Sequence, residues 1–238
     1  MKFKLSPFEK KDLVIAWLAL AVAFTLGARG ILAVFMEGFS ILSPDRLLVI
    51  FVIALITVGL SFVIHELAHK FAAIKFGYWA EFRKSPQMLV IAVAVAVITG
   101  FVFAAPGATL INTAGRQMTK RENGIISLSG PLTNIILFFI FAVVVVISLV
   151  IGGQNTLDGS LSFSSFSLVT ALFYIGWYGC QINAMIAFFN LLPVGPLDGK
   201  KILAWKPLVY VPLLVVSLVF LYYSIVPAAP LGFLMSLL

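Results

Sequence analysis

Long stretches without a charged residue constrain this sequence more than any other feature. They cover residues 13–28, 47–64, 85–115, 123–157, 159–197 and 207–238. A transmembrane α-helix needs about 20 predominantly apolar residues. Because 62% of the residues are hydrophobic and only 11% are charged, one small core cannot bury them and most of the chain must face lipid. We therefore predict an all-α polytopic membrane protein, which excludes a soluble enzyme, a nucleic-acid-binding protein and a disordered tail protein.

Five full membrane spans are predicted, and together they form a single membrane domain over residues 1–238. They lie at about 13–34, 46–76, 125–151, 166–192 and 207–226. The lysines before the first span resemble the start of a secretory signal, but the apolar stretch continues past Arg29 to Met36. A cleavable signal needs a shorter core, so we interpret this span as a retained signal anchor. Two prolines interrupt the tail at 227–238, which is left open as a sixth membrane segment.

The basic residues predict how the chain is oriented in the cell membrane. Fourteen of the sixteen lysines and arginines lie in residues 1–12, 70–84, 116–121 and 200–206. The polar connection at 152–165 has none. Since cytoplasmic loops carry the excess of positive charge, the N-terminus and these three basic segments are predicted to be cytoplasmic.

Residues 85–111 conflict with that orientation, because they are apolar enough to cross the membrane but have basic residues on both flanks. Thr99, Gly100, Pro106 and Gly107 interrupt the run. We therefore predict a re-entrant or short β segment that does not cross, which requires its backbone to be shielded by protein or to line a cavity.

The second predicted span contains an H-E-x-x-H motif formed by His65, Glu66 and His69. The motif includes both histidines of the whole chain. A spacing of four residues places both imidazoles on one helix face, as two zinc ligands require, with the glutamate near enough to act as a general base. The alternative is that both histidines only make hydrogen bonds between helices. Ionisable groups within a membrane are costly and are usually retained for function, which favours the metal site.

A catalytic zinc ion needs a third protein ligand, which must here be a carboxylate or Cys180. Asp198 is the best candidate, because it follows a long charge-free run broken by Pro193, Gly195 and Pro196. These residues interrupt a helix and allow backbone to lie beside a metal. Alternatively, Asp198 could only cap the next helix. A cysteine such as Cys180 more often packs as a small apolar residue than binds a metal.

The sequence resembles the site-2 protease family of intramembrane zinc metalloproteases, in its compact archaeal or bacterial form. Three motifs carry the resemblance across residues 50–205: His65-Glu66-Leu-Ala-His69, Gly130-Pro131-Leu-Thr-Asn134, and Asn190-Leu-Leu-Pro193 continuing to Leu197-Asp198-Gly199. Lys200 stands where many members have a second glycine after the Asp-Gly pair. No insertion is long enough for a PDZ domain.

The resemblance implies both an activity and a set of roles. His65, His69 and Asp198 would bind Zn²⁺, Glu66 would serve as general base and acid, and Asn134 and Asn190 would lie near the substrate or the reaction oxyanion. The implied partners are the lipid bilayer and a transmembrane protein substrate, cleaved in or near its membrane segment. Phe101–Ile111 is the candidate edge that receives an unwound substrate by strand addition, and a loop with a packing role only is the alternative.

Two functions of other classes remain open at this point. A zinc transporter also binds metal inside a helical bundle, although this chain has few spare carboxylates or histidines for an ion pathway. A non-catalytic scaffold of protease ancestry would be indicated by the loss of the glutamate or of a ligand, and all of these residues are present.

Overall fold

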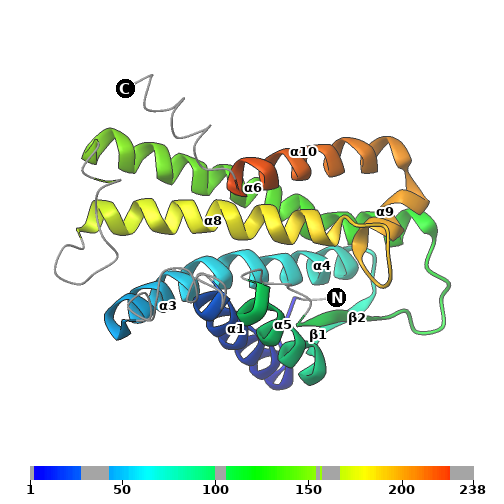
Figure 1. Ribbon diagram of the computed structural model, residues 1–238. Helices are drawn as coiled ribbons and strands as arrows, with labels where there is room; N and C mark the ends of the chain where they lie inside the picture. Colours follow the sequence, from blue (N-terminus) through cyan, green and yellow to red (C-terminus); the bar gives the residue numbers. More distant parts are fainter. Residues whose placement is uncertain (1–2, 28–42, 100–105, 154–155, 157–166, 226–238) are drawn as a thin grey trace.

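The computed structural model describes residues 3–27, 43–99, 106–153, 156 and 167–225, which are mostly helical (Figure 1). The helices are α1 (Pro7–Gly27), α3 (Pro44–Val58), α4 (Ile64–Lys75), α5 (Pro86–Thr99), α6 (Lys120–Gly152), α8 (Leu168–Asn190), α9 (Asp198–Trp205) and α10 (Pro207–Ile225). Strands β1 (Trp79–Lys84) and β2 (Gly107–Asn112) form a small antiparallel sheet. A π-helical turn, Gly59–Val63, joins α3 to α4 in one continuous rod.

Four helices of the described chain are long and apolar enough to cross a membrane: Pro44–Lys75, Lys120–Gly152, Leu168–Asn190 and Pro207–Ser224. They coincide with four of the five predicted spans. The other prediction, 13–34, coincides with α1 as far as Gly27, and its remainder lies outside the described residues, as does the tail at 227–238. The prediction of an all-α polytopic membrane protein is confirmed.

The helices pack in layers (Figure 1). Helices α6, α8 and α10 lie side by side, the rod of α3 and α4 packs against α6 and α8, and α1 packs against α3 and α5 on the other side of the rod. The main core lies between α1, α3 and α8. Fully buried alanines such as Ala16, Ala21 and Ala54 allow these helices to approach closely, as small residues do in membrane bundles.

Local sequence signals explain where several elements begin. Thr119 and Glu122 form a reciprocal capping box at the start of α6, and Ser167 accepts a hydrogen bond from the backbone of Thr170 at the start of α8. Gly77 adopts a positive φ of 83° in the turn from α4 to β1, a conformation that glycine tolerates without strain.

Helix α1 contacts the rod on the N-terminal side of the H-E-x-x-H motif. Trp17 of α1 donates from Nε1 to the carbonyl of Leu55 at 2.8 Å. A Cβ at Gly59 would lie 2.7 Å from the same Nε1 atom, so the glycine makes room for the indole. Short π-helical segments such as Gly59–Val63 are frequent at functional sites.

The described part of residues 85–111 forms α5 and β2. Helix α5 has 14 residues, and at ~1.5 Å per residue it is about 21 Å long, shorter than a hydrocarbon core of ~30 Å. Strand β2 pairs with β1, with Thr109 opposite Phe82. A short β segment therefore lies between the H-E-x-x-H helix and the Gly-Pro-x-x-Asn helix, as predicted. Phe101–Ala105, the first part of the predicted edge, lies outside the described residues.

Candidate active site

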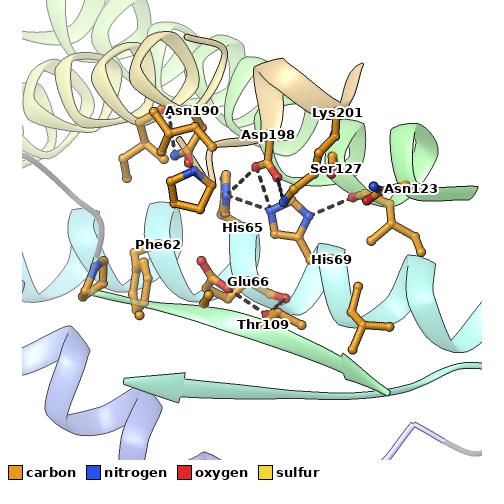
Figure 2. A pocket seen from close by; sticks show the side chains of 18 residues that line it. Phe62, His65, Glu66, His69, Thr109, Asn123, Ser127, Asn190, Asp198 and Lys201 are labelled. Atoms are coloured by element: carbon orange, nitrogen blue, oxygen red, sulfur yellow. Dashed lines mark hydrogen bonds and ion pairs between the residues drawn. The ribbon is translucent and has the colours of Figure 1, made fainter. Parts of the chain in front are cut away.

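Two side chains of α4 and one of the distant helix α9 meet at one end of the helix bundle (Figure 2). His65 and His69 lie one turn apart on α4, with their Nε2 atoms 3.0 Å apart. Asp198, the first residue of α9, places Oδ2 3.1 Å from Nε2 of His69 and 3.8 Å from Nε2 of His65. All three residues are buried, and their candidate ligand atoms lie within 4.8 Å of one another.

The course of the chain explains this meeting. Helices α4 and α8 both end near the site, and α6 crosses the bundle between them (Figure 1). The turns at 191–197 then place Asp198 against α4 and α6. The arrangement requires one complete crossing between α4 and α8, which agrees with the reading of 85–111 as a segment that does not cross.

The outer ring nitrogens of both histidines face oxygen acceptors. Nδ1 of His65 lies 2.5 Å from Oδ1 of Asn134, and Nδ1 of His69 lies 2.8 Å from the carbonyl oxygen of Ile126. An amide or carbonyl oxygen only accepts, so each Nδ1 carries a proton and each neutral ring presents a bare Nε2. Two bare nitrogens beside a carboxylate are the donor set of a zinc site with two histidines and one acid, and the residues therefore fit the ion.

Gly130 of α6 creates the space in which the two imidazoles meet. A Cβ at this position would lie 2.6 Å from Nε2 of His65 and even closer to Nε2 of His69. Real Cβ atoms do not approach other heavy atoms so closely. The glycine of the Gly-Pro-x-x-Asn motif thus allows α6 to pass directly against the ligand atoms.

Asp198 has the charge state that binds a metal ion. Against the effect of burial, the ammonium group of Lys201, which lies beside the carboxyl group and favours its charged form, lowers the pKa of Asp198. Lys201 places Nζ 3.6 Å from Oδ1 of Asp198, the oxygen that does not face the histidines. The carboxyl group is therefore ionised at neutral pH, as metal ligation requires.

Glu66 lies beside this group and faces the same cavity (Figure 2). The cavity has a volume of about 130 Å³ and is lined by Glu66, both histidines, Asp198 and residues of β2, which is enough space for several water molecules. Thr109 of β2 donates from Oγ1 to Oε2 of Glu66 at 2.8 Å. The sheet therefore holds the glutamate in place.

The two predicted asparagines lie in different places. Asn190, at the end of α8, lines the cavity and donates from Nδ2 to the carbonyl of Ile186 at 2.9 Å. Asn134 is fully buried behind His65, on the side away from the cavity. Cys180 lies elsewhere, with its sulfur 3.5 Å from the carbonyl of Phe138, and is outside the metal-binding group.

Sequence reasoning did not identify Thr109 or Lys201 as part of the site. It also did not identify Asn183 of α8, whose Oδ1 accepts from Nδ2 of Asn134 at 2.8 Å. Asn183 was visible as a polar residue in an apolar helix, one of the signals that marks function within a membrane. Thr109 could only be found through the pairing of β2 with β1, and the position of Lys201 depends on the turn that leads to α9.

The comparisons with known proteins agree with this geometry. The family model of peptidase family M50 matches residues 53–205. A candidate zinc metalloprotease of Methanocaldococcus jannaschii is 34% identical over 208 residues, which cover 87% of this chain and 90% of the relative. A candidate zinc metalloprotease of Bacillus subtilis is 30% identical over 157 residues, or 62% of this chain and 66% of the relative. No solved structure shows a significant match. The chain therefore belongs to peptidase family M50, the site-2 protease family that its motifs resemble.

Proposed function

We propose that this protein is an intramembrane zinc metalloendopeptidase that hydrolyses peptide bonds in or near transmembrane segments of membrane-protein substrates. One observation carries the proposal: His65, His69 and Asp198 converge within 4.8 Å at the end of an apolar helix bundle, with Glu66 facing the same cavity. The names of the two relatives, both zinc metalloproteases by description, support the same metal and the same class of enzyme.

His65, His69 and Asp198 would hold the zinc ion, in a ligand set of the kind that leaves one position for water or substrate. Bound zinc would polarise the scissile carbonyl and favour the attack of water at neutral pH. Glu66 accepts the proton of the attacking water and later donates it to the leaving amine. Thr109 keeps the Glu66 carboxylate turned into the cavity while this happens.

Asn190 is the candidate for contact with the substrate or the developing oxyanion. Its amide NH₂ has two protons, and the bond to the carbonyl of Ile186 uses one. The other can donate to an oxygen of the substrate, because Asn190 lines the cavity.

The substrate strand would dock along the free edge of β2. The N–H of Phe82 in β1 donates to Glu9, so Phe82 and its partner Thr109 form a pair without mutual hydrogen bonds. The N–H and C=O of Thr109 therefore point away from β1, and β2 lies between β1 and the cavity (Figure 2). A transmembrane helix that unwinds locally can pair with this edge and expose a carbonyl to the site.

We infer that the active site lies at the cytoplasmic side of a multi-pass membrane protein. The end of α4, the start of α6 and the short helix α9 lie at the same end of the bundle (Figure 1). These elements carry Lys75, Lys120 and Lys200. The positive-inside rule supports a cytoplasmic location for that end.

The test is a comparison of membrane proteomes after expression of the wild type and of Glu66→Gln. Gln has nearly the same size as Glu but cannot take the proton of water, so new termini within transmembrane segments are expected with the wild type alone. General acid–base catalysis supplies about 10²–10⁴-fold in rate, and the loss should be of that order. Equal cleavage by both proteins would refute the role of Glu66. Zinc flux into vesicles without any cleavage would instead support a transporter.

A further inference from the structure

Three buried polar side chains from three elements lie behind His65, on the side away from the cavity. They are Ser61 of the π-helical turn, Asn134 of α6 and Asn183 of α8, and each is 0% exposed. Buried polar groups within a membrane protein are costly unless they are hydrogen-bonded. These three form one chain of hydrogen bonds that ends at Nδ1 of His65.

This series of hydrogen bonds begins at Asn183, whose amide orientation is fixed by a backbone oxygen. Its Nδ2 donates to the carbonyl of Gly179 at 2.8 Å and to Oγ of Ser61 at 2.7 Å. Because a carbonyl only accepts, the NH₂ group must face Gly179 and Oδ1 must face the other way. That oxygen accepts from Nδ2 of Asn134 at 2.8 Å.

The amide of Asn134 in turn determines which ring nitrogen of His65 carries the proton. Its Nδ2 also donates to the carbonyl of Ser61 at 3.0 Å, so both amide protons are used. Its Oδ1 is thereby turned to Nδ1 of His65 at 2.5 Å. The ring proton must then sit on Nδ1, which leaves Nε2 bare on the side of the other metal-binding groups.

We propose that Asn183 is a positioning residue for His65, which acts through Asn134 to hold the imidazole in the Nδ1–H tautomer. The inference rests on the metal site of the proposed function, but not on hydrolysis. Without Asn183, Asn134 loses the acceptor that helps to fix its amide. A rotated Asn134 would present NH₂ to the ring, and His65 would then carry its proton on Nε2, the atom needed for the metal.

The first measurement is the dissociation constant for zinc in Asn183→Leu, by competition with a chromophoric chelator. Loss of a group that orients a metal-ligating histidine typically weakens metal binding by about 10–100-fold, and a weakening of that order is expected here. Gln181→Leu is the matched control, because it removes another hydrogen bond of α8, to the carbonyl of Ser224 at 2.9 Å. The control should destabilise the bundle without a change in zinc affinity.

A double variant tests the route through Asn134. If Asn183 acts through this residue, Asn134→Leu with Asn183→Leu should bind zinc no more weakly than Asn134→Leu alone. Additive losses would overturn the proposed route, because mutations that share one chain of contacts are expected to be non-additive.

The second measurement reads the tautomer in the metal-free protein, so that it stands apart from zinc binding and catalysis. With two histidines in the chain, ¹⁵N-histidine labelling gives a simple spectrum, assigned with a His69→Gln variant. The wild type should show His65 protonated on Nδ1, and Asn183→Leu should show a second population protonated on Nε2. Asn183→Ala, a smaller replacement, repeats both measurements if the leucine variant does not fold. Wild-type zinc affinity and a wild-type spectrum in the Asn183 variants would overturn the proposal.

Discussion

At the scale of single residues, the site depends on one position without a side chain. Gly130 leaves the space in which His65 and His69 bring their Nε2 atoms together, and a Cβ there would overlap both rings. Gly130→Ala is therefore expected to abolish stoichiometric zinc binding, because the methyl group displaces the imidazoles from their meeting point. Zinc content after purification, measured by mass spectrometry of the metal, checks this prediction.

The control for Gly130→Ala is Leu132→Ala, two residues further along α6, whose side chain is 40% exposed on the outer surface. This variant should retain its zinc. A full complement of zinc in Gly130→Ala would show that the imidazoles have more room than the packing of α6 against α4 indicates.

The sequence could predict which residues form the candidate site, because histidine and acidic side chains are rare in this chain. Both histidines fall in one helical turn with Glu66. The chain has few acidic residues, so Asp198 has few competitors as the third ligand. The family resemblance predicts Asn134 near the substrate or the reaction oxyanion, whereas the structure has it behind His65, against Nδ1 of the ring. The spacing of a motif gives the helix face of a residue, but which face of the partner helix it meets is set by packing.

At the scale of elements, a buried ion pair joins three parts of the fold. Glu9 of α1 pairs with Lys70 of α4, with side chains 0% and 4% exposed. Glu9 also accepts from the N–H of Phe82 in β1 at 3.1 Å, and Lys70 donates to the carbonyl of Lys4 at 2.8 Å. Since Lys70 follows His69 directly, this pair joins α1 and the sheet to the helix that carries two of the candidate metal ligands.

A double-mutant cycle tests this connection. Glu9→Gln keeps an oxygen for Phe82 but leaves Lys70 as a buried unpaired charge, and Lys70→Met leaves Glu9 unpaired. Each single change should lower the free energy of unfolding by about 3–5 kcal/mol, whereas the double variant should lose far less than the sum. Thermal unfolding in detergent, followed by tryptophan fluorescence, measures the losses. Additive losses would show that the two charges do not interact.

The elements themselves were predictable to different degrees. Charge-free runs are long enough to identify the spans. That residues 85–111 do not cross stays a prediction from their basic flanks. The sequence does not predict strand β1, because it lies in a charged connection and forms only by pairing with β2. Even the nearest pair, Lys84 with Gly107, joins residues 23 positions apart. The ion pair of Glu9 with Lys70 joins residues 61 positions apart, and no local pattern indicates such a contact.

At the scale of the whole molecule, the account predicts which end of the bundle faces the cytoplasm. In a Cys180→Ser background, Lys200→Cys on α9 would place a thiol on the cytoplasmic side, and Ser160→Cys in the connection at 152–165 would place one outside. A membrane-impermeant maleimide added to intact cells should label the Ser160 variant, and the Lys200 variant only after lysis. The reverse pattern would contradict the orientation inferred from the basic residues.

X-ray absorption at the zinc edge of the purified protein can show whether two histidines and one aspartate form a zinc site at the end of the membrane helix bundle. We expect one zinc per chain, with nitrogen and oxygen neighbours at about 2.0–2.2 Å, imidazole scattering from two rings and no sulfur at ~2.3 Å. A sulfur neighbour would implicate Cys180 in place of Asp198, and a protein that binds no zinc would contradict the account altogether.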